Sequence, residues 1–414
     1  MKGYFCKTCK NYHNKVYPKG FCPIYSKFNI KSIEFNKKEF SGSSPPGVFI
    51  GSKLKYPNVN IGVLSPVEDK EETWIYNDPL YWVKNKFSID QILKLRKSLI
   101  NSRTTTNINV VKNTPKYVNQ MQEIGMAYKP VNLEVKLKKQ PHFKIDFDKV
   151  RMPIGGNIDF EKIKITENVK IKRKVDKVVD DHDLKANNAI NYLYNNNFNE
   201  LFLSQLLSVG ALGLKKNRIL VPTRWSITAT DDLIGKNLIK EIKDYNSIDK
   251  YSYFEGNYLG NHYFILFFPD VWNFELFEGY LPNSSWNPTN KIKFATDEED
   301  YYGRKAYVKE TAGGYYACRI STARYLKNIR RQASILAIRF ETPSYYAALG
   351  VWVVRESTKK TMDNKPLIFE TKESMFKHLK KRIFSLFNYN IEHILKQSKL
   401  VNKLKTQTKL IDFK

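Results

Sequence analysis

The sequence predicts an α+β protein with mixed and antiparallel sheets, packed helices, a small N-terminal zinc module and a flexible C-terminal tail. Runs rich in β-branched and aromatic residues, such as 59–64 and 251–277, predict strands. Apolar residues at helical spacing, from Glu373 onward for example, predict amphipathic helices. The 414 residues exceed what one hydrophobic core usually serves, so we expect two domains with appendages.

Four parts are expected along the chain. Residues 1–26 are predicted to form the zinc module, 27–290 a basic α+β domain, 291–398 a second folded region, and 399–414 the tail. The boundary near 290 rests on the loop-like segment 283–303, which is acidic from Asp297 to Asp300. The tail is predicted because Lys, Asn, Gln and Thr predominate in the sequence after Leu395.

Three of the four cysteines lie within the first 22 residues, as Cys6, Cys9 and Cys22. In a cytosolic protein this density favours a metal over a disulfide. Cys6 and Cys9 have the spacing of a zinc knuckle, and His13 completes a Cys₃His tetrahedron with Cys22. A redox CxxC is the alternative, but no βαβ pattern surrounds it. The segment therefore predicts structural zinc, whereas the distant Cys318 is predicted to be core.

Turn residues alternate with short β-rich runs between 41 and 110. The loop 43–47 leads into a predicted strand at 48–50, and a second strand at 59–64 ends before Pro66. We interpret 43–47 as a structural turn rather than a phosphate cradle. A short amphipathic stretch starts at Asp78, a helix follows over 89–99, and 103–110 is alternating and β-rich.

Basic residues alternate with apolar ones between 131 and 178. This pattern predicts strands with one basic face that lies along a phosphate backbone, the alternative being a solvated strand face. Asp183 is the expected N-cap of a helix over 184–196, and another helix is expected over 199–207.

The chain is organised around LVPTRWSITATDDLIGKNL, which begins at Leu220. We expect a buried strand ending at Pro222, a β-rich run at 225–229, and a helix capped by Thr230 and Asp231. Arg224 and Thr228 would then surround a helix N-terminus, which favours phosphates of nucleic acid or a nucleotide. The alternative is that Asp231 and Asp232 only cap the helix and Trp225 fills core.

Beyond this stretch, aromatic strands are predicted over 251–277. Gly313 and Gly314 mark a turn into a helix that carries Arg319, our third candidate phosphate ligand with Arg224 and Thr228. Strands are expected at 335–340 and 348–356, before the long helix that starts near Glu373.

The net charge is +28, from 69 Lys and Arg against 41 Asp and Glu. Such an excess indicates a polyanionic partner and favours nucleic acid. The alternative is a coding bias toward Lys and Asn. No apolar run approaches the length of a membrane span and the first ten residues contain no apolar signal region, so we expect a cytoplasmic protein without a membrane partner.

Three groups of aspartates suggest a competing function: Asp146/Asp148, Asp180/Asp181/Asp183 and Asp231/Asp232. Metal-dependent phosphoryl chemistry needs carboxylates that converge on Mg²⁺, with Arg or Lys nearby. Asp181, Asp231 and Asp232 are the candidate catalytic residues of a nuclease-like enzyme acting on nucleic acid or a nucleotide. A third candidate function is the processing of RNA.

Seven blocks of this sequence, in order, resemble the archaeal Nre family of DNA repair factors: FCPIYSK, SSPPGVFIG, YPNVNIGVLSP, VDDHDLKA, LVPTRWSITATDD, TAGGYYACR and LGVWVVRE. The resemblance covers nearly the whole chain. It implies a zinc-binding N-terminal module, two conserved regions and a role in repair of DNA damage. The family usually has four cysteines near the N-terminus, and this chain has three.

Some members of that family carry a C-terminal motif that binds the sliding clamp, PCNA, and QTKLIDFK resembles it. Gln407, Leu410 and Phe413 are each three apart, so a 3₁₀ turn projects Leu410 and Phe413 together, with Ile411 as a further apolar contact. The final aromatic of the motif is replaced by Lys414. The sequence thus predicts a DNA repair factor that binds DNA and is recruited to PCNA.

Overall fold

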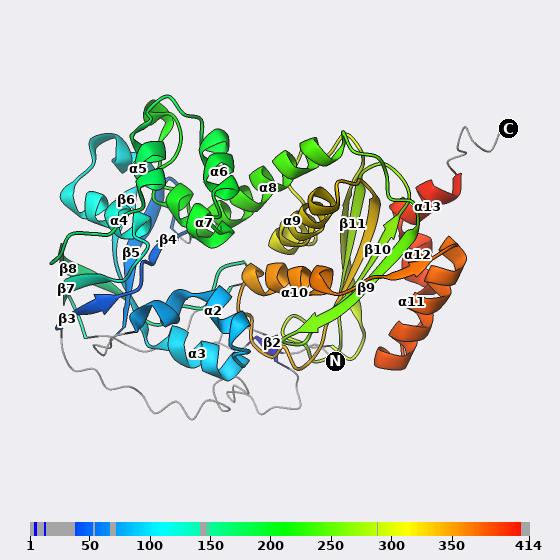
Figure 1. Ribbon diagram of the computed structural model, residues 1–414. Helices are drawn as coiled ribbons and strands as arrows, with labels where there is room; N and C mark the ends of the chain where they lie inside the picture. Colours follow the sequence, from blue (N-terminus) through cyan, green and yellow to red (C-terminus); the bar gives the residue numbers. More distant parts are fainter. Residues whose placement is uncertain are drawn as a thin grey trace. The chain divides into compact units, whose positions relative to one another are not determined.

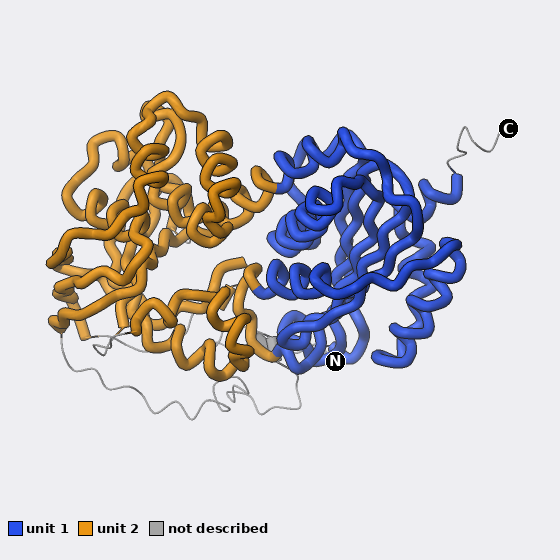
Figure 2. The backbone as a smooth tube through the Cα atoms, viewed as in Figure 1, with its two compact units in different colours: residues 1, 235–345, 353–414 blue, residues 2–234, 346–352 orange. Residues whose placement is uncertain are grey.

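The computed structural model describes residues 4–5, 12–13, 38–52, 54–66, 72–140, 147–148, 150–287 and 289–406 (Figure 1). The chain divides into two compact units, shown in Figure 2. Unit 2 contains 2–234 and 346–352, and unit 1 contains 235–345 and 353–414. Among the helices of the described ranges, none combines the length and apolar character that a bilayer crossing requires.

Unit 2 is built on a six-stranded sheet in the order β3-β7-β8-β6-β5-β4. All neighbours are antiparallel except β6 and β8. The strands are β3 Glu39–Ser44, β4 Val48–Gly51, β5 Asn58–Pro66, β6 Leu99–Asn107, β7 Val131–Leu137 and β8 Asn157–Ile165. Strict alternation in β7 buries every second residue, which places one face of the sheet in the core.

Helical segments complete unit 2, and several of them pack on this sheet. They are η1 Thr73–Asn77, α2 Pro79–Lys84, α3 Ile89–Lys97, η2 Ile108–Asn113, α4 Lys116–Met126, α5 Arg173–Asp180, α6 Ala186–Asn195, α7 Glu200–Ser208 and η3 Lys215–Asn217. Met121 and Ile124 of α4 join the buried cluster of the sheet. A separate two-stranded ladder pairs β1 Tyr4–Phe5 with β2 Tyr12–His13.

Unit 1 also contains a six-stranded sheet, in the order β12-β11-β13-β10-β9-β14. Only the β11–β13 pair is parallel among these strands. The strands are β9 Tyr251–Tyr258, β10 Asn261–Phe268, β11 Asn273–Tyr280, β12 Lys293–Glu299, β13 Ser334–Glu341 and β14 Leu367–Phe369. Every residue of β13 is buried, as expected for a central strand covered on both faces.

Helices cover both faces of the sheet of unit 1 (Figure 1). One side holds α11 Lys372–Phe387, α12 Glu392–Gln397 and α13 Lys399–Thr406, whose apolar residues join those of β9, β10, β11 and β13 in one cluster. On the other side lie α9 Ala312–Ile329 and α10 Val351–Asp363. Tyr325 of α9 packs edge-on against Phe254 and Phe267.

Two segments predicted as strands are helices. The run 225–229 is part of α8 Thr223–Ile242, and most of 348–356 forms the start of α10. The helix α8 begins directly after Pro222, whose carbonyl accepts from the N–H groups of Trp225 and Ser226. In α10 the hydroxyl groups of Thr358 and Thr361 donate to carbonyls four residues earlier. Burial and these local bonds outweigh the β propensity of the sequence.

Other expectations also differ from the structure. Residues 219–221 are irregular rather than a strand, although Leu220 and Val221 donate backbone hydrogen bonds to the carbonyls of Ile108 and Ser208. Asp183 is not the N-cap of α6, which begins after Lys185, and Arg173–Asp180 is a helix with Val175 and Val178 buried. The strand β12 lies within the segment predicted as a loop.

The predicted tail is helical as far as Thr406, because α13 is anchored on unit 1. Leu400 and Val401 are buried, and the carboxylate of Glu275 on β11 accepts from the N–H groups of Lys399 and Leu400, both at 3.1 Å, and from Ser398 Oγ. This carboxylate satisfies the free amides at the start of α13. The segment that begins at Gln407 therefore follows directly on an anchored helix.

Candidate functional site

A cavity of about 610 Å³ opens within unit 2. This volume lies in the range of small-molecule sites, roughly 300–1,000 Å³. Among the described residues, its wall contains five aromatic ones: Phe49, Trp74, Tyr128, Phe198 and Phe202. Its described lining also contains four basic residues, Arg96, Lys129, Arg151 and Lys172, and one acidic residue, Asp78. The described lining thus combines aromatic surface with more basic than acidic residues.

Arg96 is the most deeply placed of these cations. It lies on the buried face of α3 and is 1% exposed. Its Nε donates to the carbonyl of Pro153 at 2.7 Å, and its Nη1 donates to the carbonyl of Tyr76 at 3.1 Å and to Asn77 Oδ1 at 2.6 Å. These partners are all neutral. Burial, together with the nearby charge of Arg151, lowers the pKa of Arg96 to about 9, so the group remains cationic at neutral pH.

The other cations of the cavity lie against its aromatic wall. Arg151 is 5% exposed, and its guanidinium lies 4.9 Å from the centre of the Phe49 ring. Lys172 Nζ lies 5.1 Å from the Phe198 ring and 5.7 Å from that of Tyr128. Asp78, the acidic residue of the described lining, accepts from the first amides of α2 as its N-cap. The wall therefore offers cations and ring faces side by side.

The loop before β4, in the SSPPGVFIG block, is fixed by side chains from two helices. Gln205 of α7 donates to the carbonyl of Pro46 at 2.9 Å and accepts from the Val48 N–H at 3.3 Å. Thr223, the first residue of α8, accepts from the Ile50 N–H at 2.9 Å. A Cβ on Gly47 would lie 3.1 Å from Asn77 Nδ2, so glycine allows the loop to approach the residue that holds Arg96. The loop expected as a structural turn thus also lines the cavity.

A second close approach of backbone positions Arg151. Gly350 has φ +100, and a Cβ there would lie 2.7 Å from the carbonyl carbon of Arg151. The next residue, Val351, donates its N–H to the carbonyl of Val150 at 2.8 Å. Residues 346–352, which are far away in sequence, therefore hold the segment that carries Arg151. Neither Arg96 nor Arg151 belongs to a motif whose spacing identifies it, and no signal in the sequence pairs them.

Arg224 and Thr228 lie in the first turns of α8, which begins at Thr223 rather than after Thr230. The Arg224 side chain is 44% exposed and pairs with Asp148 at 3.7 Å, not with Asp231 or Asp232. Thr228 Oγ1 donates to the carbonyl of Arg224 at 3.3 Å. Because the helix starts eight residues earlier than expected, the strand–loop–helix junction predicted around these residues is not formed. A phosphate contact by Arg224 remains a prediction.

Trp225 is not a core residue. It is 47% exposed and packs on the half-exposed ring of Tyr56, with 5.5 Å between the ring centres. This exposed aromatic pair follows directly from the helical start at Thr223, which turns Trp225 away from the core.

The aspartates of the proposed metal-dependent site do not converge. Asp181 is exposed and accepts from the N–H of Asp183 at 3.2 Å. Asp231 is fully buried and Asp232 is 8% exposed, both in the middle of α8 and not at its cap. Within the described ranges, no three His, Cys, Asp or Glu side chains are placed to hold a metal ion. The carboxylate geometry that two-metal chemistry requires is thus not formed by this part of the chain.

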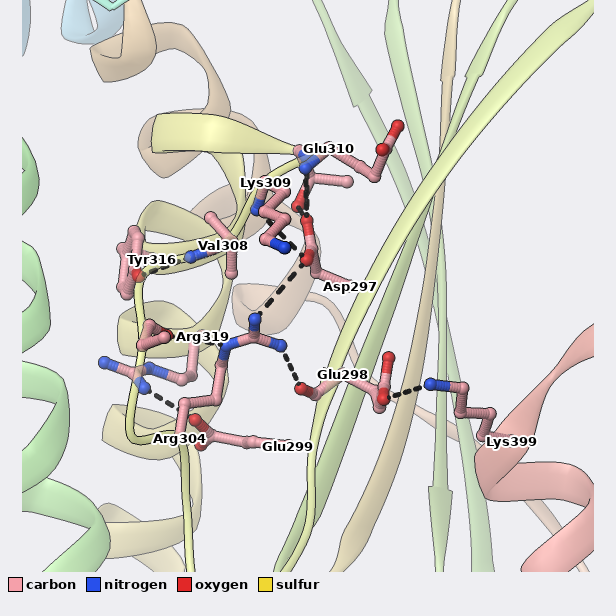
Figure 3. Close-up of polar contacts among 12 residues, drawn as sticks. Asp297, Glu298, Glu299, Arg304, Val308, Lys309, Glu310, Tyr316, Arg319 and Lys399 are labelled. Atoms are coloured by element: carbon pink, nitrogen blue, oxygen red, sulfur yellow. Dashed lines mark hydrogen bonds and ion pairs between the residues drawn. The ribbon is translucent and has the colours of Figure 1, made fainter.

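Arg319 is used inside unit 1 (Figure 3). It is 1% exposed, and its Nη1 donates to Glu299 Oε2 at 2.7 Å. Glu299 belongs to the acidic run of β12, in which Asp297 accepts from the amides of Glu310 and Thr311 at 3.0 and 2.8 Å. The acidic run therefore shapes the segment before α9. The charge of Arg319 is compensated within the fold and is not presented to a phosphate.

The strands β7 and β8 do not form the basic face that their lysines suggested. Lys136 pairs with Glu39 at 3.2 Å and with Glu161 at 3.7 Å, while Lys164 pairs with Glu134 at 3.8 Å. Acidic and basic residues therefore alternate on the exposed face of the sheet. The alternative interpretation, a solvated strand face, describes this surface.

The remaining predicted site residues lie outside the described part of the chain. These are Cys6, Cys9 and Cys22 at the N-terminus and Gln407, Leu410, Ile411 and Phe413 at the C-terminus. Of His13 only the backbone is described, as the end of β2. The zinc site and the clamp motif therefore stay predictions.

Comparison with known proteins identifies the family. Residues 18–287 match the family described as archaeal Nre, N-terminal, and 299–413 match archaeal Nre, C-terminal. DNA repair protein NreA of Archaeoglobus fulgidus is 37% identical over 88% of this chain and 90% of its own length. NreA of Haloferax volcanii is 35% identical over 80% of each, and DNA repair protein NreB of Archaeoglobus fulgidus is 34% identical over 94% and 95%.

No solved structure matches this chain. The two family matches are separated by the interval between 287 and 299, whereas the two compact units divide within α8 and on either side of 346–352. Both matches together span most of the sequence. The chain belongs to the archaeal Nre family.

Proposed function

We propose that this protein is a DNA repair factor that binds DNA and is recruited to the sliding clamp PCNA through residues 407–414. The repair role rests on one observation: relatives that align with 80–94% of the chain are named DNA repair proteins. The net charge of +28 and the cationic, aromatic cavity of unit 2 supply the chemistry for contact with nucleic acid.

Binding of DNA is tested by titrating the full chain into labelled single-stranded, nicked and branched DNA, with and without Mg²⁺. We expect binding without cleavage, and an affinity that falls linearly with the logarithm of salt concentration, because counterions are released from the phosphates. Absence of binding at low salt would overturn the proposal. Cleavage that requires Mg²⁺ would favour the nuclease-like enzyme instead.

Recruitment to the clamp is supported by the spacing of Gln407, Leu410 and Phe413 and by the position of the motif after α13. An anchored helix gives the motif a defined origin on unit 1. Two lysines that precede the motif are engaged within the fold: Lys399 pairs with Glu298 at 2.6 Å, and Lys403 donates to Asn273 at 2.9 Å. Attraction of an acidic clamp surface therefore falls to Lys405 and Lys409.

A structural zinc ion on Cys6, Cys9, His13 and Cys22 is the third part of the proposal, and thiolate and imidazole ligands suit this metal. We expect one zinc per chain in metal analysis of purified protein. Removal of the metal with a chelator should make the three thiols reactive and leave the DNA affinity of the chain unchanged. Metal-free protein whose thiols react freely from the start would contradict this part.

A further inference from the structure

Two buried arginine side chains line the cavity of unit 2. Arg96 and Arg151 are 1% and 5% exposed, and each lines the same cavity. The hydrogen bonds of Arg96 go to two carbonyls and an amide, all of them neutral. A buried cation with neutral partners is stabilised by an anion, and guanidinium groups bind phosphate through charge-assisted hydrogen bonds. This end of the cavity is suited to a phosphate.

The remainder of the wall is suited to a planar aromatic group. Tyr128, Phe198 and Trp74 line it, and Lys172 lies over the first two of these rings. Nucleic acid bases that have left the stack are held in this way, between aromatic rings and cations. A base and a phosphate on one ligand therefore match the two parts of the wall.

The volume restricts the ligand further. About 610 Å³ is the space of a drug-sized molecule and cannot accept a double helix, whose bases are also hidden in the stack. A nucleotide enters such a cavity either free in solution or after it has turned out of its strand. Damaged or mismatched nucleotides leave the stack at the lowest cost.

We propose that this cavity binds a single unstacked nucleotide, with its phosphate on Arg96 and Arg151 and its base against Tyr128, Phe198 and Trp74. The inference rests on the proposed function, because DNA is the polymer that would present the nucleotide. It assigns recognition of an extruded nucleotide to unit 2.

The test is calorimetric titration of the full chain with the four deoxynucleoside 5′-monophosphates, the matching nucleosides and inorganic phosphate. We expect the nucleotide to bind about tenfold or more tightly than either fragment, because phosphate contacts with arginine are charge-assisted. The variants Arg151→Gln and Lys172→Glu should each weaken nucleotide binding by about tenfold. Lys172 is exposed, so its variant keeps the test valid if the buried Arg151→Gln chain fails to fold.

Lys177→Glu is the matched control. Lys177 Nζ lies 5.7 Å from the ring of Tyr192, the same distance that separates Lys172 from Tyr128, but this pair does not line the cavity. The control should bind nucleotide like the unchanged protein. Equal losses of nucleotide affinity in Lys172→Glu and Lys177→Glu would overturn the proposal. Nucleosides that bind as tightly as nucleotides would also overturn it.

A second arm separates this inference from DNA binding itself. The same variants are titrated into a labelled single-stranded oligonucleotide and into a duplex with one unpaired nucleotide. Nucleotide binding without DNA binding would support the cavity and contradict the proposed function. DNA binding without any nucleotide binding would leave the proposed function standing and overturn the cavity.

Discussion

Replacing Arg339 by methionine is expected to lower the free energy of unfolding of unit 1 by about 3–5 kcal/mol, the cost of breaking a buried ion pair from one side. Arg339 lies on the central strand β13, fully inside the fold. It donates to Glu278 at 2.6 Å, to Glu341 at 3.1 Å and to Asn261 Oδ1 at 2.6 Å. Methionine fills much of the space but leaves two carboxyl groups buried without the guanidinium.

The loss of unfolding free energy in Arg339→Met should depend on pH. The titration of Glu341 sets the direction of this dependence. Burial raises the pKa of Glu341 to about 7 in the folded protein, from an ordinary value of 4.5. The folded state therefore holds the proton more tightly, so stability from this group falls as pH rises from about 4.5 through 7. Without Arg339 the pKa rises further. We expect a larger destabilisation of Arg339→Met at pH 8 than at pH 5.5.

Denaturant unfolding at the two pH values, followed by hydrogen exchange of the β10 and β13 amides, measures both effects. Arg382→Met is the matched control, because Arg382 pairs with Glu255 at the surface with 40% of its side chain exposed. An exposed pair contributes at most about 1 kcal/mol. Equal destabilisation of Arg339→Met and Arg382→Met would contradict a stabilising role for the buried ion pairs of Arg339.

Replacing Arg319 by methionine should also cost unit 1 about 3–5 kcal/mol, because Glu299 would remain buried without its partner. Both side chains are 1% exposed. Glu299 also accepts from the indole N–H of Trp272 at 3.1 Å, so the pair ties β12 and α9 to the start of β11. DNA affinity, measured where the variant is still folded, should not change, since the guanidinium does not face a phosphate.

A double-mutant cycle with Glu299→Gln separates the ion pair from general packing. We expect each single variant to be strongly destabilised. The double variant should lose less unfolding free energy than the two single variants lose together, with a coupling energy of about 2–3 kcal/mol. Additive losses would show that the pair is not coupled. A selective loss of DNA affinity in Arg319→Met would restore this residue as a phosphate ligand.

Periodicity supports some of the elements that the sequence predicted correctly. The strand β7 alternates strictly, and the helix α11 shows apolar residues at helical spacing. The strands β9–β11 were instead predicted from their aromatic content, and β10 and β11 are almost completely buried. The failures at 225–229 and 348–356 concern β-branched and aromatic runs that are buried on several sides. Such runs look alike as strands and helices, and only the packing around α8 and α10 decides between them.

The cavity was less accessible to sequence reasoning than the fold. The SSPPGVFIG block is visible in the sequence, but Arg96 and Arg151 lie 55 positions apart. They line one cavity because α3 packs against 150–154, where Arg96 donates to the carbonyl of Pro153. Conversely, Arg319 and Asp231 drew attention as charged residues in prominent motifs and proved to be buried. From a single sequence, a charged residue that stabilises the fold cannot be distinguished from a charged residue that binds a ligand.

The proposed recruitment to PCNA is tested most directly by titrating the clamp with three proteins: the full chain, a truncation that ends at Thr406, and Phe413→Ala. The truncation retains α13 and its anchor on Glu275, so its fold should be unchanged. The account predicts binding by the full chain, clear weakening in Phe413→Ala because an apolar anchor is lost, and no specific binding by the truncation. Equal affinity of all three for the clamp would contradict it.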